Sequence, residues 1–491
     1  MKKKVIVIGA GLGGVSAAIS LATKGYEVEV YEKNSHVGGK LNFIEKGGYS
    51  FDLGPSILTM PEIFEKLFEE NKKKMSDYVK TQKIGLQWRA FFEDHKPIDL
   101  YDTPEKTVEA NNLSEKDLRD LKDYCEYSKK LYEATKRGYF DKGLDTMTEI
   151  LKEHGLIGAF KDFDYFHTMH QGVEKRISNP YLVKTIDFFI KYVGSSPYDA
   201  PAILNLLPYI QFEYGLWYVN GGMYNLAKGL EKLMRETGVK VYLNSEVTGM
   251  KQENGRITSI VLSDKTEKTA DLFVSNMEVI PAYQKLLGRE TKDYDKKFEP
   301  ACSGLVVHLG VKKQYPQLAH HNFFFSKDPE KHFETVFHKK QLPKDPTIYL
   351  VASSRTDPSQ APEGCENIKI LPHIPYLQDP PFTKKDYEEL KENVLDKLER
   401  MGLEDIRKNT VVEETWTPED IQKNYYSNKG AIYGVVSDKA KNKGFKAPKK
   451  SEYYQNLYFV GGSVNPGGGM PMVALSGQQV KDKITKKTPL S

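Results

Sequence analysis

The sequence predicts an α/β fold in which a Rossmann-like dinucleotide-binding domain is combined with an interleaved substrate domain of mixed sheet and helices. Three observations predict this fold. The chain opens with a strand, a glycine-rich turn, a helix and a second strand, and it closes with a strand, a glycine-rich stretch and a helix. Between them, alternating apolar segments indicate an antiparallel sheet. With 491 residues, of which 39% are hydrophobic, the chain can form two or three compact units.

The opening segment is the clearest of these elements. Residues 5–8 are aliphatic and suit a parallel strand covered on both faces. Residues 15–23 favour a helix, Gly25 ends it, and the alternation over residues 26–31 indicates a second strand. The sequence therefore predicts a βαβ unit of about 30 residues.

The middle of the chain is less regular. Residues 61–175 are rich in Lys, Glu and Tyr at helical spacing, and we expect a mostly helical, mixed region without a clear strand pair. Residues 180–217 are the most apolar part. They favour either helices packed in a core or a wall that contacts an apolar ligand or a membrane.

The later part of the chain again combines strands, glycines and helices. We expect a helix over 223–236 and a strand over 239–243, with Ile260 and Leu262 pairing with residues 271–274. Alternating segments over 303–375 predict an antiparallel sheet. The last strand, 457–460, and a helix over 472–483 are expected to meet the opening segment in space.

These elements predict a division of the chain into three parts. We expect a cofactor domain from residues 1–75, 220–300 and 425–491. Residues 76–219 are expected to form a helical, membrane-facing and substrate region, and residues 301–424 a substrate domain with the antiparallel sheet.

Composition limits the partners. The chain has 71 Lys and Arg residues and 67 Asp and Glu residues, which gives a net charge of +4. This small excess of positive charge is not typical of a nucleic-acid-binding protein, so we expect no nucleic-acid partner. The three cysteines lie far apart, which fits a reducing, cytoplasmic compartment better than a disulfide framework. The lysine-led start imitates a signal peptide, but its glycines interrupt the apolar run. No apolar run is long enough to span a bilayer, whereas peripheral contact stays open.

A glycine motif indicates the cofactor. Gly9, Gly11 and Gly14 fit the GxGxxG pattern, in which the backbone and a helix N-terminus approach a pyrophosphate. Glu32 ends the second strand, where a carboxylate can accept hydrogen bonds from ribose hydroxyls. The alternative is a tight structural turn. Further glycine pairs, at 38–39 and 461–462, favour a flavin over a nicotinamide cofactor.

Longer motifs carry a resemblance to a known family. The segments are VGGK at 37–40, FDLGPS at 51–56, GGM at 221–223 and LYFVGGSVNPGGGMPMVALSGQQV at 457–480. Together with the opening pattern, they resemble the FAD-dependent carotenoid desaturase family, within the wider amine-oxidase-like and phytoene desaturase-like flavoproteins. The resemblance implies FAD as cofactor.

Other stretches are similar to the oxygenase branch of that family. They are residues 176–204, 314–326, 371–383 and 416–436, and the segment GGSVNPGGG at 461–469 stands where desaturases usually carry GAxTHPGAG. The resemblance implies oxidation of the terminal methyl group of a thirty-carbon carotenoid to an aldehyde, on a route to carboxylated pigments of the staphyloxanthin type. A dehydrosqualene or phytoene desaturase and a non-catalytic, escort-like isoprenoid-binding protein are the alternatives.

The resemblance also implies a set of cofactor-binding residues, from the pyrophosphate and ribose through the adenine to the isoalloxazine. They are Gly9, Ala10, Gly11, Leu12, Gly13, Gly14, Glu32, Lys33, Gly39, Lys40, Gly54, Pro55, Ser56, Val247, Gly462, Met470, Pro471, Met472 and Val473. Val247 is placed at the adenine, and residues 470–473 near the ribityl chain and isoalloxazine. No catalytic side chain is identified, because the isoalloxazine is itself the reactive group.

The substrate implied is insoluble in water, so we expect the protein to lie peripherally on the inner face of the cell membrane and take its carotenoid from the bilayer. Dioxygen or a quinone would reoxidise the flavin. The candidates to line an apolar tunnel are Phe188, Phe189, Ile203, Leu204, Leu206, Leu207, Phe323, Phe324 and Phe325.

Histidines suggest a rival chemistry based on iron. Five of the eleven histidines fall in one stretch of the chain: His308, His320, His321, His332 and His338. His167 and His170 form an HxxH pair, and two histidines with a carboxylate can hold non-haem iron. Neither set matches a recognised iron motif, so we expect core or surface histidines and no metal site. Ser476 lacks the preceding glycine of a nucleophile elbow.

Overall fold

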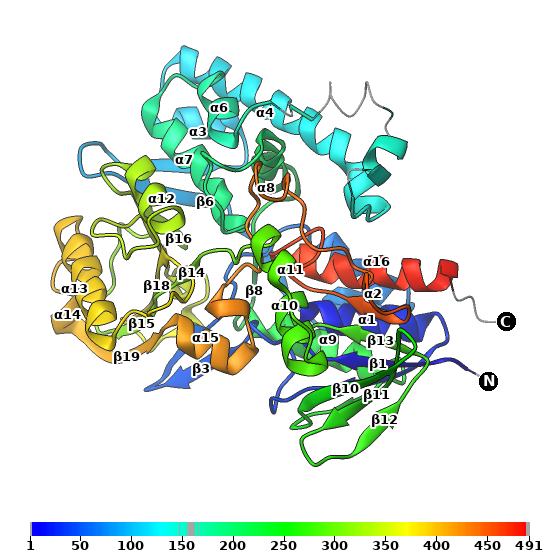
Figure 1. Ribbon diagram of the computed structural model, residues 1–491. Helices are drawn as coiled ribbons and strands as arrows, with labels where there is room; N and C mark the ends of the chain where they lie inside the picture. Colours follow the sequence, from blue (N-terminus) through cyan, green and yellow to red (C-terminus); the bar gives the residue numbers. More distant parts are fainter. Residues whose placement is uncertain (1, 147, 154, 156–162, 165, 488–491) are drawn as a thin grey trace.

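The computed structural model describes residues 2–146, 148–153, 155, 163–164 and 166–487. One half of the protein is built on a five-stranded parallel sheet with the order β20-β13-β1-β2-β9 (Figure 1). Its strands are β1 (Lys4–Ile8), β2 (Glu27–Tyr31), β9 (Lys240–Tyr242), β13 (Leu272–Ser275) and β20 (Leu457–Phe459). The predicted βαβ unit is confirmed, and the last strand lies in the sheet of the first.

Helices α1 (Leu12–Thr23) and α16 (Met470–Lys487) lie side by side next to this sheet (Figure 1). The Ser16 hydroxyl donates to the Ala474 carbonyl at 2.6 Å. A Cβ on Gly477 would lie 2.5 Å from the backbone nitrogen of Ala17, so the two helices touch backbone to backbone. The predicted meeting of the first and last segments is therefore confirmed.

The two faces of the parallel sheet are covered differently. Val5 and Val7 pack against the helices, which include α2 (Glu62–Glu69) and α9 (Tyr224–Glu236). Ile6 and Ile8 point to the other face, toward the antiparallel sheet of β10 (Val247–Glu253), β11 (Arg256–Leu262) and β12 (Glu267–Thr269). Burial on both faces explains why the inner strands β1 and β13 are almost wholly apolar.

The expected pairing of Ile260 and Leu262 with residues 271–274 is wrong. Ile260 pairs with Met250 and Lys268 inside the three-stranded sheet, whereas β13 pairs with β1 and β20. All four residues of β13 are buried. A strand without a polar face suits the centre of a parallel sheet better than an exposed antiparallel one.

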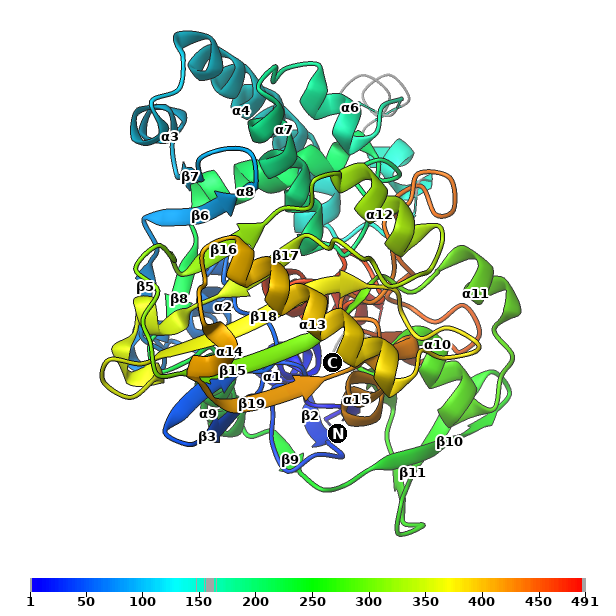
Figure 2. The ribbon, with the colours of Figure 1, turned by 90° about the vertical axis from the view of Figure 1, so that its left-hand side faces the viewer.

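The second large sheet has eight strands, in the order β19-β15-β18-β17-β16-β6-β7, with β14 paired to β18. It is antiparallel except for the parallel pair β16–β6. The strands are β6 (Leu86–Phe91), β7 (Ile98–Tyr101), β14 (Ser303–Gly304), β15 (Val306–Val311), β16 (His321–Phe324), β17 (Ile348–Val351), β18 (Glu366–Ile374) and β19 (Thr410–Trp416). The antiparallel sheet predicted over 303–375 is confirmed, and helix α13 (Lys384–Arg400) crosses one of its faces (Figure 2).

The hairpin β6–β7 corrects the expectation for residues 61–175, where we foresaw no clear strand pair. Trp88 and Ala90 are fully buried against the second sheet. Because β6 pairs with β16, more than 200 positions later in the chain, the partner that stabilises it is invisible to local periodicity.

A helical layer covers the other end of the molecule, at the top of Figure 1. It consists of α3 (Pro104–Asn111), α4 (Glu115–Thr135), α6 (Met169–Glu174), α7 (Pro180–Asp187), η3 (Phe188–Tyr192), η4 (Ala202–Asn205) and α8 (Leu206–Tyr214). The remaining described strands and α-helices are β3 (Phe43–Lys46), β4 (Tyr49–Asp52), β5 (Thr81–Lys83), β8 (Trp217–Val219), α10 (Val279–Pro281), α11 (Lys292–Lys297), α12 (Pro329–Phe337), α14 (Ile406–Asn409) and α15 (Pro418–Tyr425).

The apolar segment over 181–218 is packed inside the protein. All of these residues are described, and Glu213 alone among them is exposed. The expectation that this segment presents apolar side chains to a membrane is therefore wrong. In the described part of the chain, no helix has the length and apolar character needed to cross a bilayer.

Candidate functional site

A cavity of about 480 Å³ lies where the carboxyl ends of β1, β2 and β13 meet the start of α1. Its wall continues along the start of α16 and reaches η4 and α8 in the helical layer. Ligands of open α/β sheets bind at the carboxyl ends of the strands. The cavity therefore joins the expected cofactor position to the apolar part of the helical layer.

The glycine turn between β1 and α1 has no room for side chains. Gly9 has a φ of +90°, and a Cβ on Gly14 would lie 2.1 Å from the carbonyl oxygen of Gly9. A Cβ on Gly13 would lie 2.9 Å from the backbone nitrogen of Gly461. Gly9, Gly11 and Gly13 all line the cavity. The turn can thus bring backbone close to a bound group.

Helix α1 presents its N-terminus to the cavity. It begins at Leu12, has no side-chain cap, and carries no acidic residue in its first turn. The partial positive charge of a helix N-terminus stabilises anions such as phosphate.

Asn276, which the sequence analysis missed, holds this turn in place. It directly follows β13 and lines the cavity, and its Oδ1 accepts a hydrogen bond from the Gly14 N–H at 2.7 Å. The signal available in the sequence was a polar residue immediately after a buried parallel strand, at the edge where sites form.

Glu32 lies at the end of β2, is 5% exposed and lines the cavity. Its Oε2 accepts from the Ala10 N–H at 2.7 Å, and its Oε1 accepts from the Asn34 N–H at 2.8 Å. The carboxylate therefore fixes the glycine turn while facing the cavity. The neighbouring Lys33 donates to the Lys423 carbonyl at 2.9 Å, on the rim.

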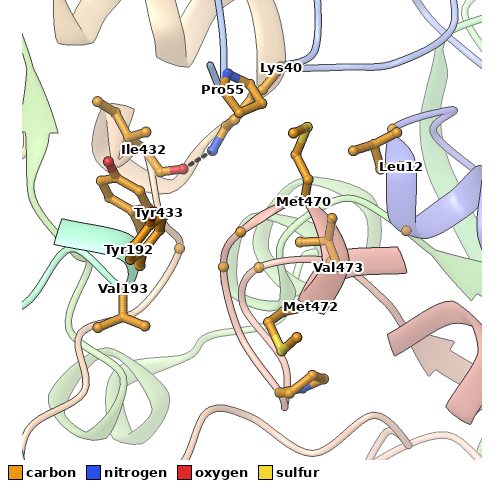
Figure 3. A pocket seen from close by; sticks show the side chains of 18 of the residues that line it. Leu12, Lys40, Pro55, Tyr192, Val193, Ile432, Tyr433, Met470, Met472 and Val473 are labelled. Atoms are coloured by element: carbon orange, nitrogen blue, oxygen red, sulfur yellow. Dashed lines mark hydrogen bonds between the residues drawn. The ribbon is translucent and has the colours of Figure 1, made fainter. Parts of the chain in front are cut away.

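Gly39 and Lys40 lie against the same turn. A Cβ on Gly39 would lie 3.1 Å from the Cα of Gly11. The Nζ of Lys40 donates to the carbonyls of Ala431 and Ile432, both at 3.0 Å, and the second of these bonds is drawn in Figure 3. The amine of Lys40 thus connects two segments of the cavity wall.

The loop of Gly54, Pro55 and Ser56 forms another part of the wall. Lys369 holds it, because its Nζ donates to the Gly54 carbonyl and, at 3.1 Å, to the Ser56 hydroxyl. Burial lowers the pKa of Lys369 to about 8. Burial likewise raises the pKa of the neighbouring Asp52 to about 6, although Lys369 acts in the opposite direction.

The start of α16 forms the wall opposite Tyr192, Val193 and Tyr433 (Figure 3). Gly461, Gly467 and Gly469 have φ values of +107°, +121° and +98°, which L-residues with side chains rarely adopt. The wall here includes Gly462, Met470, Pro471, Met472 and Val473, and Val247 lines the cavity beyond Glu32. Ser476 has a structural role, since its hydroxyl accepts from the Gly461 N–H at 2.9 Å.

The apolar arm of the cavity contains part of the predicted tunnel. Ile203, Leu204, Leu206 and Leu207 line it, together with Ile210. The five phenylalanines of the prediction do not. Phe189 stacks on Trp88 with ring centroids 4.0 Å apart, and Phe324 stacks on Phe91 at 4.5 Å. They pack in the core because the second sheet is covered on both faces.

The histidines do not form a metal centre in the described part of the chain, where no group of three or more His, Cys, Asp or Glu side chains is placed to hold an ion. Burial lowers the pKa of His308, His320 and His332 to about 3. His338 is exposed and lies 2.9 Å from Asp199, and His170 lies 2.6 Å from Asp187.

Comparison with known proteins identifies the family. The sequence model of the protein family described as flavin containing amine oxidoreductase matches residues 12–484 of the chain. The chain belongs to this family. As a flavin containing amine oxidoreductase, it is an oxidoreductase with FAD as its cofactor. The glycine turn, the uncapped start of α1 and the buried carboxylate of Glu32 fit a dinucleotide of this kind.

A curated relative and two solved structures are similar to the chain over nearly its whole length. The chain is 57% identical to the 4,4'-diaponeurosporene oxygenase of Staphylococcus aureus (strain USA300), over 99% of both chains. Among solved structures, an oxidoreductase from Methanosarcina mazei matches with a TM-score of 0.64 and 16% identity, over 98% of this chain and 100% of the other. The Rab GDI of Plasmodium falciparum shares the fold as well, with a TM-score of 0.58 and 13% identity, over 99% and 98%.

Proposed function

We propose that this oxidoreductase oxidises the terminal methyl group of a thirty-carbon carotenoid, 4,4'-diaponeurosporene, to an aldehyde. The observation that carries the proposal is that the glycine turn at Gly9 and the apolar wall of Ile203 to Ile210 line the same cavity. The name of the 57% identical relatives supports the choice of substrate and reaction.

Within the cavity we propose that the residues around the glycine turn hold FAD. The pyrophosphate would lie on residues 9–14 and Gly39, the ribose at Glu32 and the adenine at Val247. The isoalloxazine would lie against residues 470–473, with residues 54–56 and Gly462 alongside. We further propose the division into a cofactor domain (1–75, 220–300, 425–491), a helical substrate region (76–219) and a substrate domain (301–424).

FAD, when bound, supplies a two-electron acceptor for the reaction. The chain itself supplies placement. A polyene lying along the wall of Leu204, Leu206 and Leu207 would bring one chain end toward Met470 and Val473, and the polyene against this apolar wall would exclude water. With dioxygen as oxidant the change balances as R–CH3 + O2 → R–CHO + H2O. A quinone would require the oxygen atom to come from water.

We propose that the protein works peripherally on the inner face of the cell membrane, where its substrate resides. Phe166, near the start of α6, is 71% exposed, the most exposed of the described large apolar side chains. Lys439 donates to the carbonyl of Phe166 at 2.6 Å, and both Lys439 and Lys443 line the cavity. An exposed aromatic residue whose backbone is bonded by a cavity-lining lysine fits contact with an anionic bilayer.

The alternatives have weaker support. A desaturase would place an internal carbon pair at the flavin, but the similar relatives carry the oxygenase name. A non-catalytic isoprenoid-binding protein could share the fold, but the family match and the glycine turn at the cavity support a flavin enzyme.

Co-expression with each of two carotenoid supplies tests the proposal. Cells that make 4,4'-diaponeurosporene should accumulate a terminal aldehyde, detected by mass and by its carbonyl vibration. Cells that make dehydrosqualene should gain little new conjugation. Longer chromophores from dehydrosqualene without a carbonyl product would favour the desaturase instead.

A further inference from the structure

Lys191, near the end of η3, is a buried lysine whose amine is surrounded by aromatic rings and, among the described residues, has no hydrogen-bond acceptor. It is 4% exposed, and its Nζ lies over four aromatic rings. The distances to the ring centroids are 4.2 Å for Tyr192, 4.5 Å for Tyr349, 4.9 Å for Trp88 and 5.1 Å for Phe323. Within the described residues, its Nζ has neither a hydrogen bond nor a carboxylate partner.

Other buried lysines of the chain are different. Lys369 donates to Gly54 and Ser56, Lys446 donates to Val435 and Ser437, and Lys449 donates to Asp145 and Asn465. An unsatisfied buried polar group destabilises a protein. The exception at Lys191 therefore needs a reason.

Lys191 lines the cavity. The two residues that follow it, Tyr192 and Val193, face the start of α16 across the open space in Figure 3. The wall near them is apolar or aromatic, with Val306, Leu371 and Tyr349. The partner that the amine lacks can thus come from a molecule held in the cavity.

The surroundings select the chemistry of that molecule. Burial without a nearby carboxylate holds the pKa of Lys191 well below its ordinary value, and the aromatic faces beside its Nζ are only weak acceptors for its N–H groups. A saturated or conjugated hydrocarbon end offers no partner to such an amine. A hydroxyl or carbonyl oxygen does.

We propose that Lys191 binds the oxygen-bearing end of the carotenoid, both at the alcohol stage and as the aldehyde, and so retains the chain in the cavity after its first oxidation. The inference rests on the proposed function. Lys191 is a binding residue in this account, selective for oxygenated chain ends over the hydrocarbon.

Reductive trapping tests the position of the amine. An aldehyde that lies beside Lys191 would condense with it to an imine and water, and cyanoborohydride would deliver hydride to the imine carbon to leave a stable secondary amine. Wild type holoenzyme incubated with the terminal aldehyde of 4,4'-diaponeurosporene should gain one adduct, mapped to Lys191 by peptide mass. K443M, which removes another cavity-lining lysine, should be labelled equally. Labelling at Lys191 no higher than at exposed lysines would overturn the proposal.

Binding measurements separate this role from a merely structural one. K191M keeps an unbranched side chain of similar size without the donor, so its FAD content and Tm serve as folding checks. The aldehyde should bind at least about tenfold more weakly to K191M, the effect of one lost polar contact, while the hydrocarbon should bind equally well. Equal loss for both ligands, or no loss for either, would contradict the proposal.

These tests need no turnover, so they fail separately from the proposed function. Trapping at Lys191 in a protein that cannot oxidise the hydrocarbon would contradict the proposed function and support the binding role of Lys191. Normal oxidation with no preference of Lys191 for the aldehyde would contradict the binding role and support the proposed function. If K191M does not fold, the trapping result on wild type decides alone.

Discussion

Gly11 lies where the glycine turn meets both the cavity and Asn276. A Cβ there would lie 2.6 Å from Nδ2 of Asn276, whose Oδ1 holds the Gly14 N–H. G11V should therefore displace Asn276 and lower FAD content to about a tenth of wild type or less, with the protein still folded. Flavin absorbance per protein measures it. G85V is the matched control, because no atom lies within 4 Å of a Cβ on Gly85. Full flavin content in G11V would contradict the assignment of the turn.

Lys446 gives a pH dependence of stability at the residue scale. Burial lowers its pKa from 10.5 to about 7. The folded state therefore favours the neutral amine, so its contribution to stability is complete above the unfolded pKa and falls as the pH drops toward about 7. K446M lacks this titration. The stability of wild type relative to K446M should rise by up to about 1.4 kcal/mol per pH unit between these values.

The measurement is the difference in Tm between wild type and K446M across that pH range. The Tm of the wild type should increase relative to that of K446M as the pH rises. A difference that stays constant with pH would show that Lys446 is charged in the folded protein.

Individual residues also show how far sequence reasoning reaches. Gly9, Gly14 and Glu32 could be predicted because each belongs to a local motif whose geometry depends on neighbouring residues. Asn276 was marked only by its position after a strand, whereas its bond to the glycine turn and the surroundings of Lys191 depend on segments distant in the chain. The prediction that five phenylalanines line the tunnel was wrong for the same reason. A run of aromatic residues does not show which of them pack in the core and which face a cavity.

At the scale of elements, the contact between α1 and α16 joins the two ends of the chain. It also fixes the relative position of the starts of these two helices, which both line the cavity. A Cβ on Gly477 would lie 2.5 Å from Ala17 nitrogen and 2.7 Å from the Gly13 carbonyl oxygen. G477V should therefore push the helices apart, destabilise the protein by about 1–3 kcal/mol and loosen FAD. Urea unfolding and FAD release on dilution measure the two effects.

The control for this variant lies on the same helix. Lys486 is exposed in the last turn of α16, so K486V introduces the same side chain without a clash and should change stability by a few tenths of a kcal/mol at most. Equal behaviour of G477V and K486V would show that the helix contact does not position the cofactor.

Elements also mark where local patterns lose their meaning. The βαβ unit and the strands of 303–375 are predicted by short-range patterns, and they are present. The pairing of β13 and the hairpin β6–β7 depend on partners far along the chain, so periodicity could neither assign the first nor detect the second.

For the whole molecule, the position of Phe166 beside Lys439 predicts how the protein meets a bilayer. F166D should reduce co-flotation with vesicles containing anionic lipid, because it replaces a ring suited to the interface with a charge that anionic lipid repels. V411D is the control, since Val411 is also an exposed apolar residue, 45% accessible, on β19 of the second sheet. Loss of flotation in V411D but not in F166D would place the membrane face elsewhere.

The central claim is that one cavity holds both the flavin and the polyene. A crystal structure of the purified protein with FAD and 4,4'-diaponeurosporene tests it most directly. We expect the pyrophosphate at the N-terminus of α1, the isoalloxazine against residues 470–473, and the polyene along Leu204, Leu206 and Leu207 with one end toward Met470 and Val473. Density for the carotenoid outside this cavity, or for the flavin away from the glycine turn, would contradict the account.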